Sequence, residues 1–233
     1  MSRHAELAAN LAQVQERITA ACAAAGRYPA EVTLVVVTKY FPASDVRLLA
    51  ELGVTDVGEN RHQEALAKAE ECADVGMRWH FVGNLQSNKA AAVSAYAQVV
   101  ESVDRAKLVA PLDRGAQEHG HTLDVLVQVG LDRPGQAGER SGVDPGQVSA
   151  LAGLVEAAPG LRLRGLMAVA PLDEDPRTAF ARLARIRSEL LREHPTATWL
   201  SAGMSGDLEA GIEVGATHVR VGRAVLGERP SIK

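Results

Sequence analysis

Lys39 is the residue whose position most clearly allows chemistry, because its primary amine follows the apolar run at residues 32–38. An amine at the open end of a buried strand can be a solvated cap or a phosphate clamp. If it is desolvated enough to lose its proton, it can also form a Schiff base with an aldehyde. A lone lysine at a strand end is usually a solvated cap. The rest of the sequence therefore has to decide between these uses.

A second set of candidate residues lies near the end of the chain. Residues 201–206 are small and contain glycine, and a helical pattern follows them to about Val214. Such loops bind phosphate through backbone N–H groups, and Gly222 would let the backbone approach from the other side. Ser205 has a plainer interpretation as a helix N-cap. Arg220 is harder to explain, since a guanidinium within an apolar run needs a partner.

Other familiar sites are not supported. The sequence has no Walker loop, GxGxxG fingerprint or HExxH helix. His119 and His121 lack nearby acidic or cysteine ligands, so we expect an exposed loop and no metal site. His80 is expected to be a hydrogen-bonded histidine of the core or its rim. Cys22 and Cys72 have no close-spaced partner, which disfavours a disulfide or zinc site and fits a reducing cytoplasm.

The composition indicates one soluble domain. The 233 residues are 46% hydrophobic, enough for one barrel or two small domains, and no linker divides them. We therefore predict a single domain over residues 1–233, with a barrel over 32–230. The net charge of −4, the lack of a basic stripe and the 3% aromatic content disfavour nucleic-acid binding.

The first 26 residues predict an extra helix before the barrel. They are neither a signal peptide nor a membrane span. The helix should have one apolar stripe: Leu7, Leu11, Val14, Ile18 and Cys22.

Short apolar runs alternate with helical stretches along the rest of the chain. Several runs are continuously apolar, as expected for parallel strands covered on both faces. The eight expected strands are 32–38, 54–58, 78–82, 99–103, 123–129, 163–169, 198–201 and 218–221. This alternation predicts a (β/α)8 barrel, with a doubly wound open sheet as the alternative.

Two helix starts carry recognisable signals. Asn60 followed by Gln63 resembles a capping box, and Asp175 before Pro176 is a typical N-cap followed by proline at the first helical position. The latter helix should bury Phe180, Leu183, Ile186 and Leu190. In a barrel, the segments just after the strands form the functional face, and Lys39, Asn60, Ser201 and Gly222 all fall there.

Several strings of residues carry a family resemblance. VVVTKYFPASDV, GENRHQE, WHFVGNLQSNK, GLMAV, LSAGMSGDLEAGIEVGATHVRVG and VLGERP are spread over nearly the whole chain. Together they resemble the pyridoxal 5′-phosphate (PLP) homeostasis protein family, small cofactor-binding barrels similar to the N-terminal domain of alanine racemase. The resemblance implies a fold-type III PLP site.

The resemblance also implies roles for individual residues. Lys39 would hold the cofactor aldehyde as an internal aldimine, and Arg220 would face the pyridine nitrogen. The phosphate would be held by Ser201, Ser205 and the backbone N–H groups at Gly222 and Arg223, while Asn60 and Met167 would line the ring. The sequence departs from the family pattern at Ala202 and Arg223, which leaves the role of the Arg223 side chain open.

The expected chemistry is limited. An arginine cannot give up its proton, so the ring nitrogen would stay unprotonated and the ring would be a weak electron sink. A racemase with such a sink needs a second acid or base, which in the alanine racemase family is a tyrosine from a C-terminal β-domain, and this sequence ends at Lys233. We therefore expect a cytoplasmic PLP carrier with no catalytic activity, which passes PLP to PLP-dependent apoenzymes. Two alternatives are a PLP-dependent racemase or lyase whose partner supplies the second acid, and a Schiff-base aldolase.

Overall fold

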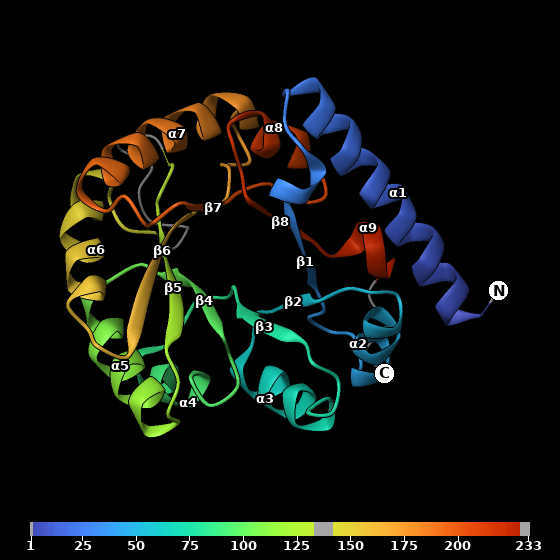
Figure 1. The fold of residues 1–233 in the computed structure, drawn as a ribbon, viewed down its shortest axis with the longest axis horizontal. Coiled ribbons are helices and arrows are strands. Elements are labelled where there is room, and N and C mark those ends of the chain that lie inside the picture. Colours follow the sequence, from blue (N-terminus) through green and yellow to red (C-terminus); the bar gives the residue numbers. More distant parts are fainter. Residues whose placement is uncertain (1, 133–141, 229–233) are drawn as a thin grey trace.

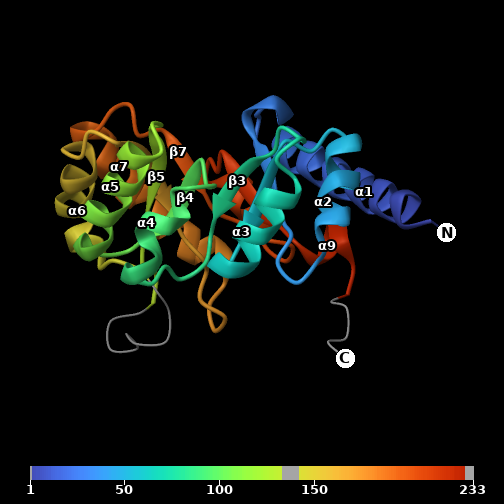
Figure 2. The same ribbon diagram turned by 90° about the horizontal axis from the view of Figure 1, so that it is seen from below.

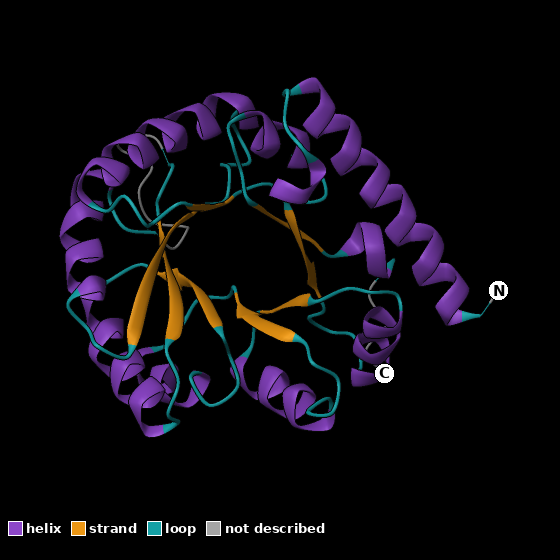
Figure 3. Cartoon of the chain, viewed as in Figure 1, coloured by secondary structure: helices purple, strands orange, loops and turns teal. Residues whose placement is uncertain are grey.

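The computed structural model describes residues 2–132 and 142–228, and within them the strands close into one parallel barrel. Each strand pairs with the next in sequence, and β1 also pairs with β8 (Figures 1 and 3). This closure confirms the predicted (β/α)8 barrel and contradicts the open sheet. The strands are β1 (Thr33–Val37), β2 (Asp56–Glu59), β3 (Arg78–Phe81), β4 (Val99–Val103), β5 (Leu123–Gln128), β6 (Leu161–Met167), β7 (Trp199–Ser201) and β8 (His218–Val221).

Helices surround this ring of strands (Figure 3). The α-helices are α1 (Arg3–Ala24), α2 (Ala43–Glu51), α3 (His62–Glu71), α4 (Ala90–Val93), α5 (Val109–Glu118), α6 (Val148–Glu156), α7 (Pro176–Glu193), α8 (Leu208–Glu213) and α9 (Arg223–Leu226). Short 3-10 turns are η1 (Pro29–Glu31), η2 (Ser87–Lys89), η3 (Ala106–Leu108) and η4 (Pro145–Gln147). Within the described ranges, no helix combines the length and apolar character that a membrane crossing requires.

Alternating residues of each strand face the helices and the barrel interior. On β1, Val36 packs in the apolar cluster that includes the α1 stripe, whereas Val35 and Val37 lie against Gly58 of β2. The side chains of Glu101, Ser201 and Arg220 come from β4, β7 and β8 and contact one another across the interior. The barrel axis is therefore polar at this level, and the larger apolar core lies between strands and helices.

The extra helix α1 covers the side of the barrel where β8 meets β1. Figure 1 shows it alongside α8 and α9, which are only six and four residues long, and Figure 2 shows it at the edge of the barrel from a second direction. Polar contacts join them, from Arg17 to Glu209 at 2.8 Å and from Asn10 to the Val225 carbonyl at 3.0 Å. All five residues of the predicted stripe are buried, which confirms it: Leu7, Leu11, Val14, Ile18 and Cys22.

Two expected helix starts differ from the structure, and one agrees. Helix α3 begins at His62 with Arg61 as N-cap and no side-chain cap bond, so the Asn60 capping box is wrong. Ser205 is not an N-cap either, because α8 begins at Leu208 after Asp207. The expected start of α7 is confirmed, since Asp175 accepts a hydrogen bond from the Arg177 N–H at 3.0 Å.

Candidate functional site

Arg220 lies in the barrel interior near the C-terminal ends of the strands and is 4% exposed. Its Nη1 donates to Ser201 Oγ at 2.5 Å, and its Nη2 donates to the Ala168 carbonyl at 2.8 Å. Nη1 also lies 3.7 Å from Glu101 Oε2. Burial lowers the pKa of this guanidinium, but an arginine keeps its charge in proteins. The partner that we expected for Arg220 is thus a set of three buried residues: Glu101 of β4, Ala168 after β6, and Ser201 of β7.

The Glu101 carboxylate continues this network deeper into the barrel. It accepts the Ser201 hydroxyl at 2.6 Å and contacts His80 Nδ1 at 2.7 Å, while His80 Nε2 lies 2.9 Å from Asp56. Burial raises the pKa of Glu101, but the bond to His80 and the charges of His80 and Arg220 outweigh burial and lower it to about 2. Burial lowers the pKa of His80, but its two carboxylate partners outweigh this and raise it. The negative charge of Glu101 and the two hydrogen bonds of Arg220 hold its guanidinium in one orientation.

Lys39 follows β1 at the same mouth, on a backbone held by a buried ion pair beneath it. Lys68 donates to the Thr38 carbonyl and to Glu59 Oε1, both at 2.7 Å. The Lys39 amine makes no hydrogen bond or ion pair with any described residue, and its nearest ring contact is Tyr40, with the centroid 5.9 Å away. Within the described residues its amine is therefore not engaged in a hydrogen bond or ion pair, unlike that of the buried Lys68.

The loops after β7 and β8 present unused donors at the mouth. The backbone N–H groups of Ser205, Gly206, Gly222 and Arg223 have no acceptor within residues 2–132 and 142–228. Gly203 allows the sharp turn with φ +97°, and a Cβ at Gly222 would lie only 3.2 Å from the Val37 carbonyl. Clustered free N–H groups suit an anion such as a phosphate group.

The remaining predicted residues occupy the same end of the barrel. Met167 ends β6, is buried and pairs in register with Ser201. Asn60 follows β2 and is half-buried. The side chain of Arg223 is exposed, whereas its N–H begins α9. The structure thus joins Ser201 to Arg220 directly, and it places the other predicted residues on the ends of neighbouring strands.

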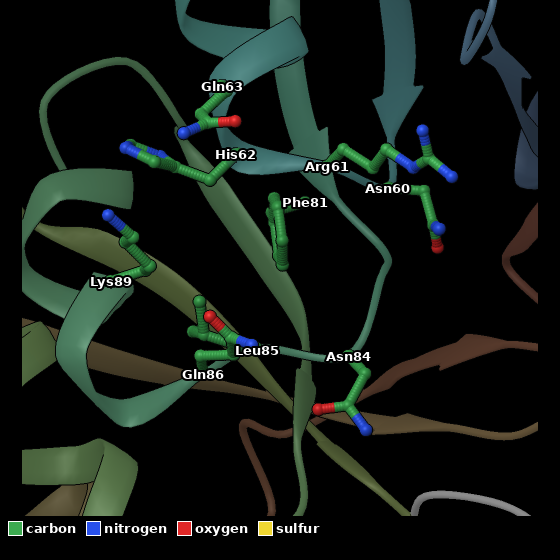
Figure 4. Close-up of a pocket in the computed structure, with 9 residues that line it drawn as sticks. All are labelled: Asn60, Arg61, His62, Gln63, Phe81, Asn84, Leu85, Gln86 and Lys89. Atoms are coloured by element: carbon green, nitrogen blue, oxygen red, sulfur yellow. The ribbon is translucent and has the colours of Figure 1, made fainter.

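A pocket of about 310 Å³ adjoins Asn60 between the loops after β2 and β3 (Figure 4). Its polar wall includes Arg61, His62 and Lys89, and no carboxylate lines it. Burial, followed by the charge of Lys89, lowers the pKa of His62. His62 also stacks on Tyr96 with the ring centroids 5.8 Å apart. This mouth of the barrel is therefore basic as well as polar.

The donors and the amine fit a small molecule with an aldehyde, a phosphate and one further acceptor. Lys39 can attack an aldehyde, and the free backbone N–H groups can hold a phosphate. Arg220 has N–H groups left over after its contacts with Ser201, Ala168 and Glu101, and these can donate to the further acceptor. Among the described residues, no group of three or more His, Cys, Asp or Glu side chains is arranged to hold a metal ion.

Sequence reasoning missed the charged partners on β2 and β4. Glu101 and Asp56 were available as a signal, because each is an acidic residue in a strand whose residues are all buried. Such residues need buried partners, as Arg220 does. The predicted role of His80 as a hydrogen-bonded interior histidine is confirmed.

Comparison with known proteins agrees with this arrangement. The family model for "Alanine racemase, N-terminal domain" matches residues 5–230. The pyridoxal phosphate homeostasis protein of Mycobacterium tuberculosis H37Rv is 43% identical, over 97% of this chain and 94% of the relative. The structure of PipY from Synechococcus elongatus with PLP bound has a TM-score of 0.81 and 32% identity, covering 95% of this chain and all of PipY.

A more distant similarity bears on the fold alone. Alanine racemase from Corynebacterium glutamicum has a TM-score of 0.69 at 16% identity, covering 99% of this chain and 63% of the racemase.

Proposed function

We propose a function for this chain from one premise: it belongs to the alanine racemase N-terminal domain family, in the group of pyridoxal phosphate homeostasis proteins. The proposed function is to bind PLP reversibly, to hold it on Lys39, and to keep the reactive aldehyde from stray amines without catalysing a reaction. The observation that carries this proposal is the Lys39 amine, which makes no hydrogen bond or ion pair within the described part of the chain.

Each part of the cofactor would meet a group described above. Lys39 would bind the aldehyde carbon, and the N–H groups of Gly222 and Arg223 would donate to the phosphate together with Ser205 and Ser201. Arg220 would donate to the pyridine nitrogen, and Asn60 and Met167 would line the ring. The bonds from Ser201 and Glu101 to Arg220 would orient it for this contact. PLP itself supplies an electron-accepting ring and a reactive aldehyde.

The absence of catalysis is proposed from the Arg220 contact. A guanidinium is a permanent donor, so it favours an unprotonated ring nitrogen and weakens the ring as an electron sink. Enzymes that need a strong sink pair that nitrogen with an acid, but the nearby Glu101 is already bonded to Ser201 and His80. Its lowered pKa also makes Glu101 a poor proton donor.

Two of the three tyrosines are poorly placed to act as the second acid or base of a racemase. Tyr96 is buried, and burial, followed by the charge of Glu59, raises its pKa well above the ordinary value. Tyr28 precedes β1 and lies at the opposite mouth. Tyr40, beside Lys39, is the one tyrosine in the chain that lies at the predicted cofactor site.

We also propose that the chain acts as one domain in the cytoplasm, with the helical segment 1–26 packed on a barrel over 32–230. The contacts from α1 to α8 and α9 support this organisation. Residues 229 and 230 of the proposed barrel lie outside the described residues. Transfer of PLP to apoenzymes is part of the same proposal.

The direct test is to load the purified protein with PLP, reduce it with borohydride, and locate the phosphopyridoxyl group by peptide mass spectrometry. Modification at Lys39 is expected, together with loss of the visible absorbance band in Lys39→Ala. Lys107→Ala is the matched control, since Lys107 is an exposed lysine with no role in the proposed cofactor site. An unchanged band in Lys39→Ala would overturn the assignment.

A second assay separates the carrier from the alternative enzyme. The PLP-loaded protein should not interconvert D- and L-alanine, and it should not cleave 3-hydroxy amino acids. Activity that is retained through purification and lost in Lys39→Ala would favour the racemase or lyase.

A further inference from the structure

A second pocket, of about 540 Å³, opens at the opposite mouth of the barrel from the predicted cofactor site. Its position is set by the strands, because the first residues of five strands contribute to its wall. These are Thr33, Asp56, Arg78, Trp199 and His218. All the lining residues fall in the described ranges, and the volume is within the range of small-molecule pockets.

Three guanidinium groups line this pocket: those of Arg27, Arg78 and Arg187. Arg187 donates to the carbonyls of Thr198 and Gly215, and its Nε has no hydrogen-bond partner in the described part of the chain. No described carboxylate forms an ion pair with it. Burial and the charge of Arg27 lower the pKa of Arg187. Arg187 therefore carries a half-buried positive charge that no described carboxylate neutralises.

The two carboxylates of the pocket are already engaged. Glu31 contacts Arg27 Nε at 3.3 Å and accepts the Tyr28 N–H at 2.9 Å. Asp56 lies 2.9 Å from His80 Nε2 and accepts the Thr55 hydroxyl at 2.6 Å. Arg78 is likewise paired, with Asp124 at 2.6 Å, so the positive charge left over in the pocket is that of Arg187.

The pocket's wall also includes two aromatic rings, those of Trp199 and His218. The rings of Trp199 and His218 lie 4.4 Å apart, and burial lowers the pKa of His218 to about 4, so it is uncharged at neutral pH. Arg78 and Arg164 lie over the Trp199 ring at 4.9 and 4.1 Å. Stacking on the ring limits the freedom of both guanidinium groups.

We propose that this N-terminal mouth binds a small phosphate-type oxyanion, held by Arg187 and Arg27 with Trp199 as the wall. Guanidinium groups suit this ligand because their planar N–H pairs match the spacing of phosphate oxygens. Carbonyl contacts orient Arg27 as well, since its Nη1 donates to Ile212 and Ala216 at 3.0 and 2.8 Å. This site is separate from the predicted cofactor site and does not depend on Lys39.

The test uses the two tryptophans of the chain as a reporter. Trp79→Phe leaves Trp199 as the single tryptophan. The PLP-loaded protein is titrated with inorganic phosphate, and separately with glycerol phosphate, against chloride at matched ionic strength. A saturable change in Trp199 emission is expected for at least one phosphate compound. Tighter binding of the ester would identify a phosphate monoester as the occupant, and tighter binding of the free ion would identify phosphate itself.

Two variants at this mouth should shift the dissociation constant in opposite directions. Arg187→Met should raise it at least tenfold, and Glu31→Gln should lower it at least twofold by removing a competing negative charge. The Glu31 side chain is 47% exposed and Gln keeps an acceptor for the Tyr28 N–H, so this gain in affinity tests the site even if Arg187→Met folds poorly.

Matched controls come from the same helix and the other mouth. Arg177→Met removes an exposed arginine of α7 that pairs with Glu213, and it should leave phosphate binding unchanged. Lys107→Met, at an exposed position in the loop after β4, should also titrate like the parent. The alternative is that Arg27 and Arg187 bind no ligand and only stabilise the fold through their hydrogen bonds to backbone carbonyls. Either the absence of a saturable Trp199 response or unchanged constants in both Arg187→Met and Glu31→Gln would establish that alternative.

Discussion

The rings of His80 and His218 lie 6.1 Å apart in the barrel interior, yet their surroundings shift their pKa values in opposite directions. His80 lies between two carboxylates that raise its pKa. His218 has the Thr217 hydroxyl as its polar partner, and burial lowers its pKa to about 4. One imidazole is thus held charged and its neighbour is held neutral.

This difference predicts the pH dependence of stability. As the pH falls, His218 takes up a proton near pH 6.5 in the unfolded chain but only near pH 4 in the folded chain. The free energy of unfolding should therefore fall by about 3 kcal/mol from this group as the pH falls through that window. His80 has the opposite sign: its contribution is complete below pH 6.5 and is lost as the pH rises through its raised pKa.

Urea unfolding followed by circular dichroism from pH 4 to 7 measures this effect. His218→Gln should flatten the slope, while His4→Gln, at an exposed position on α1, should keep it. Parallel slopes for the parent and His218→Gln would contradict the assignment.

Arg220→Gln should weaken PLP binding. It removes a charge-assisted hydrogen bond, which is commonly worth about 1.5–3 kcal/mol, so the dissociation constant should rise at least tenfold. The variant also leaves Glu101 with less compensating charge, and the melting temperature should fall. Arg220→Lys separates the two effects, because it restores the charge but not the planar group. Equal PLP affinity in Arg220→Gln and the parent would argue against the ring contact.

Ser205→Ala should lower PLP affinity without lowering stability. Ser205 is not the N-cap of α8, so the loss of its hydroxyl removes no helix bond. A lost hydrogen bond to phosphate should cost about 0.5–1.5 kcal/mol of binding. Asp207→Ala is the contrasting variant, since the Asp207 carboxylate accepts the Met204 N–H and its loss should lower the melting temperature. Calorimetry and thermal unfolding of both variants check the distinction, and a destabilised Ser205→Ala would contradict it.

Lys68→Met should be strongly destabilising because it leaves Glu59 as an unpaired buried charge. Removing one partner of a buried pair typically costs about 3–5 kcal/mol. Burial already outweighs the charge of Lys68 and raises the pKa of Glu59. The double variant Lys68→Met/Glu59→Leu should recover much of the lost stability, as judged by urea unfolding. Lys107→Met, at an exposed position, serves as the control. A double variant no more stable than Lys68→Met would exclude the unpaired charge as the cause.

The strand pattern could be predicted because it depends on local composition. The runs at 99–103 and 218–221 coincide with β4 and β8, and the other strands differ from prediction by two residues or fewer at each end. Barrel closure was also predicted, and pairing of β1 with β8 confirms it.

The missed features depend on contacts between distant residues. Glu101 and Ser201 are 100 positions apart, so no local pattern joins them. The Asn60 capping box failed for a different reason: the helix begins two residues after Asn60, and Asn60 packs closely against Gly83 instead. The assignment of Ser205 as an N-cap failed because the turn extends to Asp207 before α8 begins. The positions of Lys39 and Arg220 in the barrel follow from the fold, but their roles with PLP remain predictions.

Helix α1 packs against residues 208–226, which are synthesised long after it. Helix α1 is synthesised before the barrel, and several of its partners come from the last part of the described chain: Glu209, Val225 and Leu226. During translation Val36, Phe41 and Leu49 of its apolar cluster are made soon after it. The other members of the cluster are made only when almost the whole barrel has been synthesised: Leu208, Ile212, Val219, Val221, Val225 and Leu226. We therefore expect the nascent chain to expose this helix to chaperones, and seating of α1 across the junction of β8 and β1 to be a late step of folding.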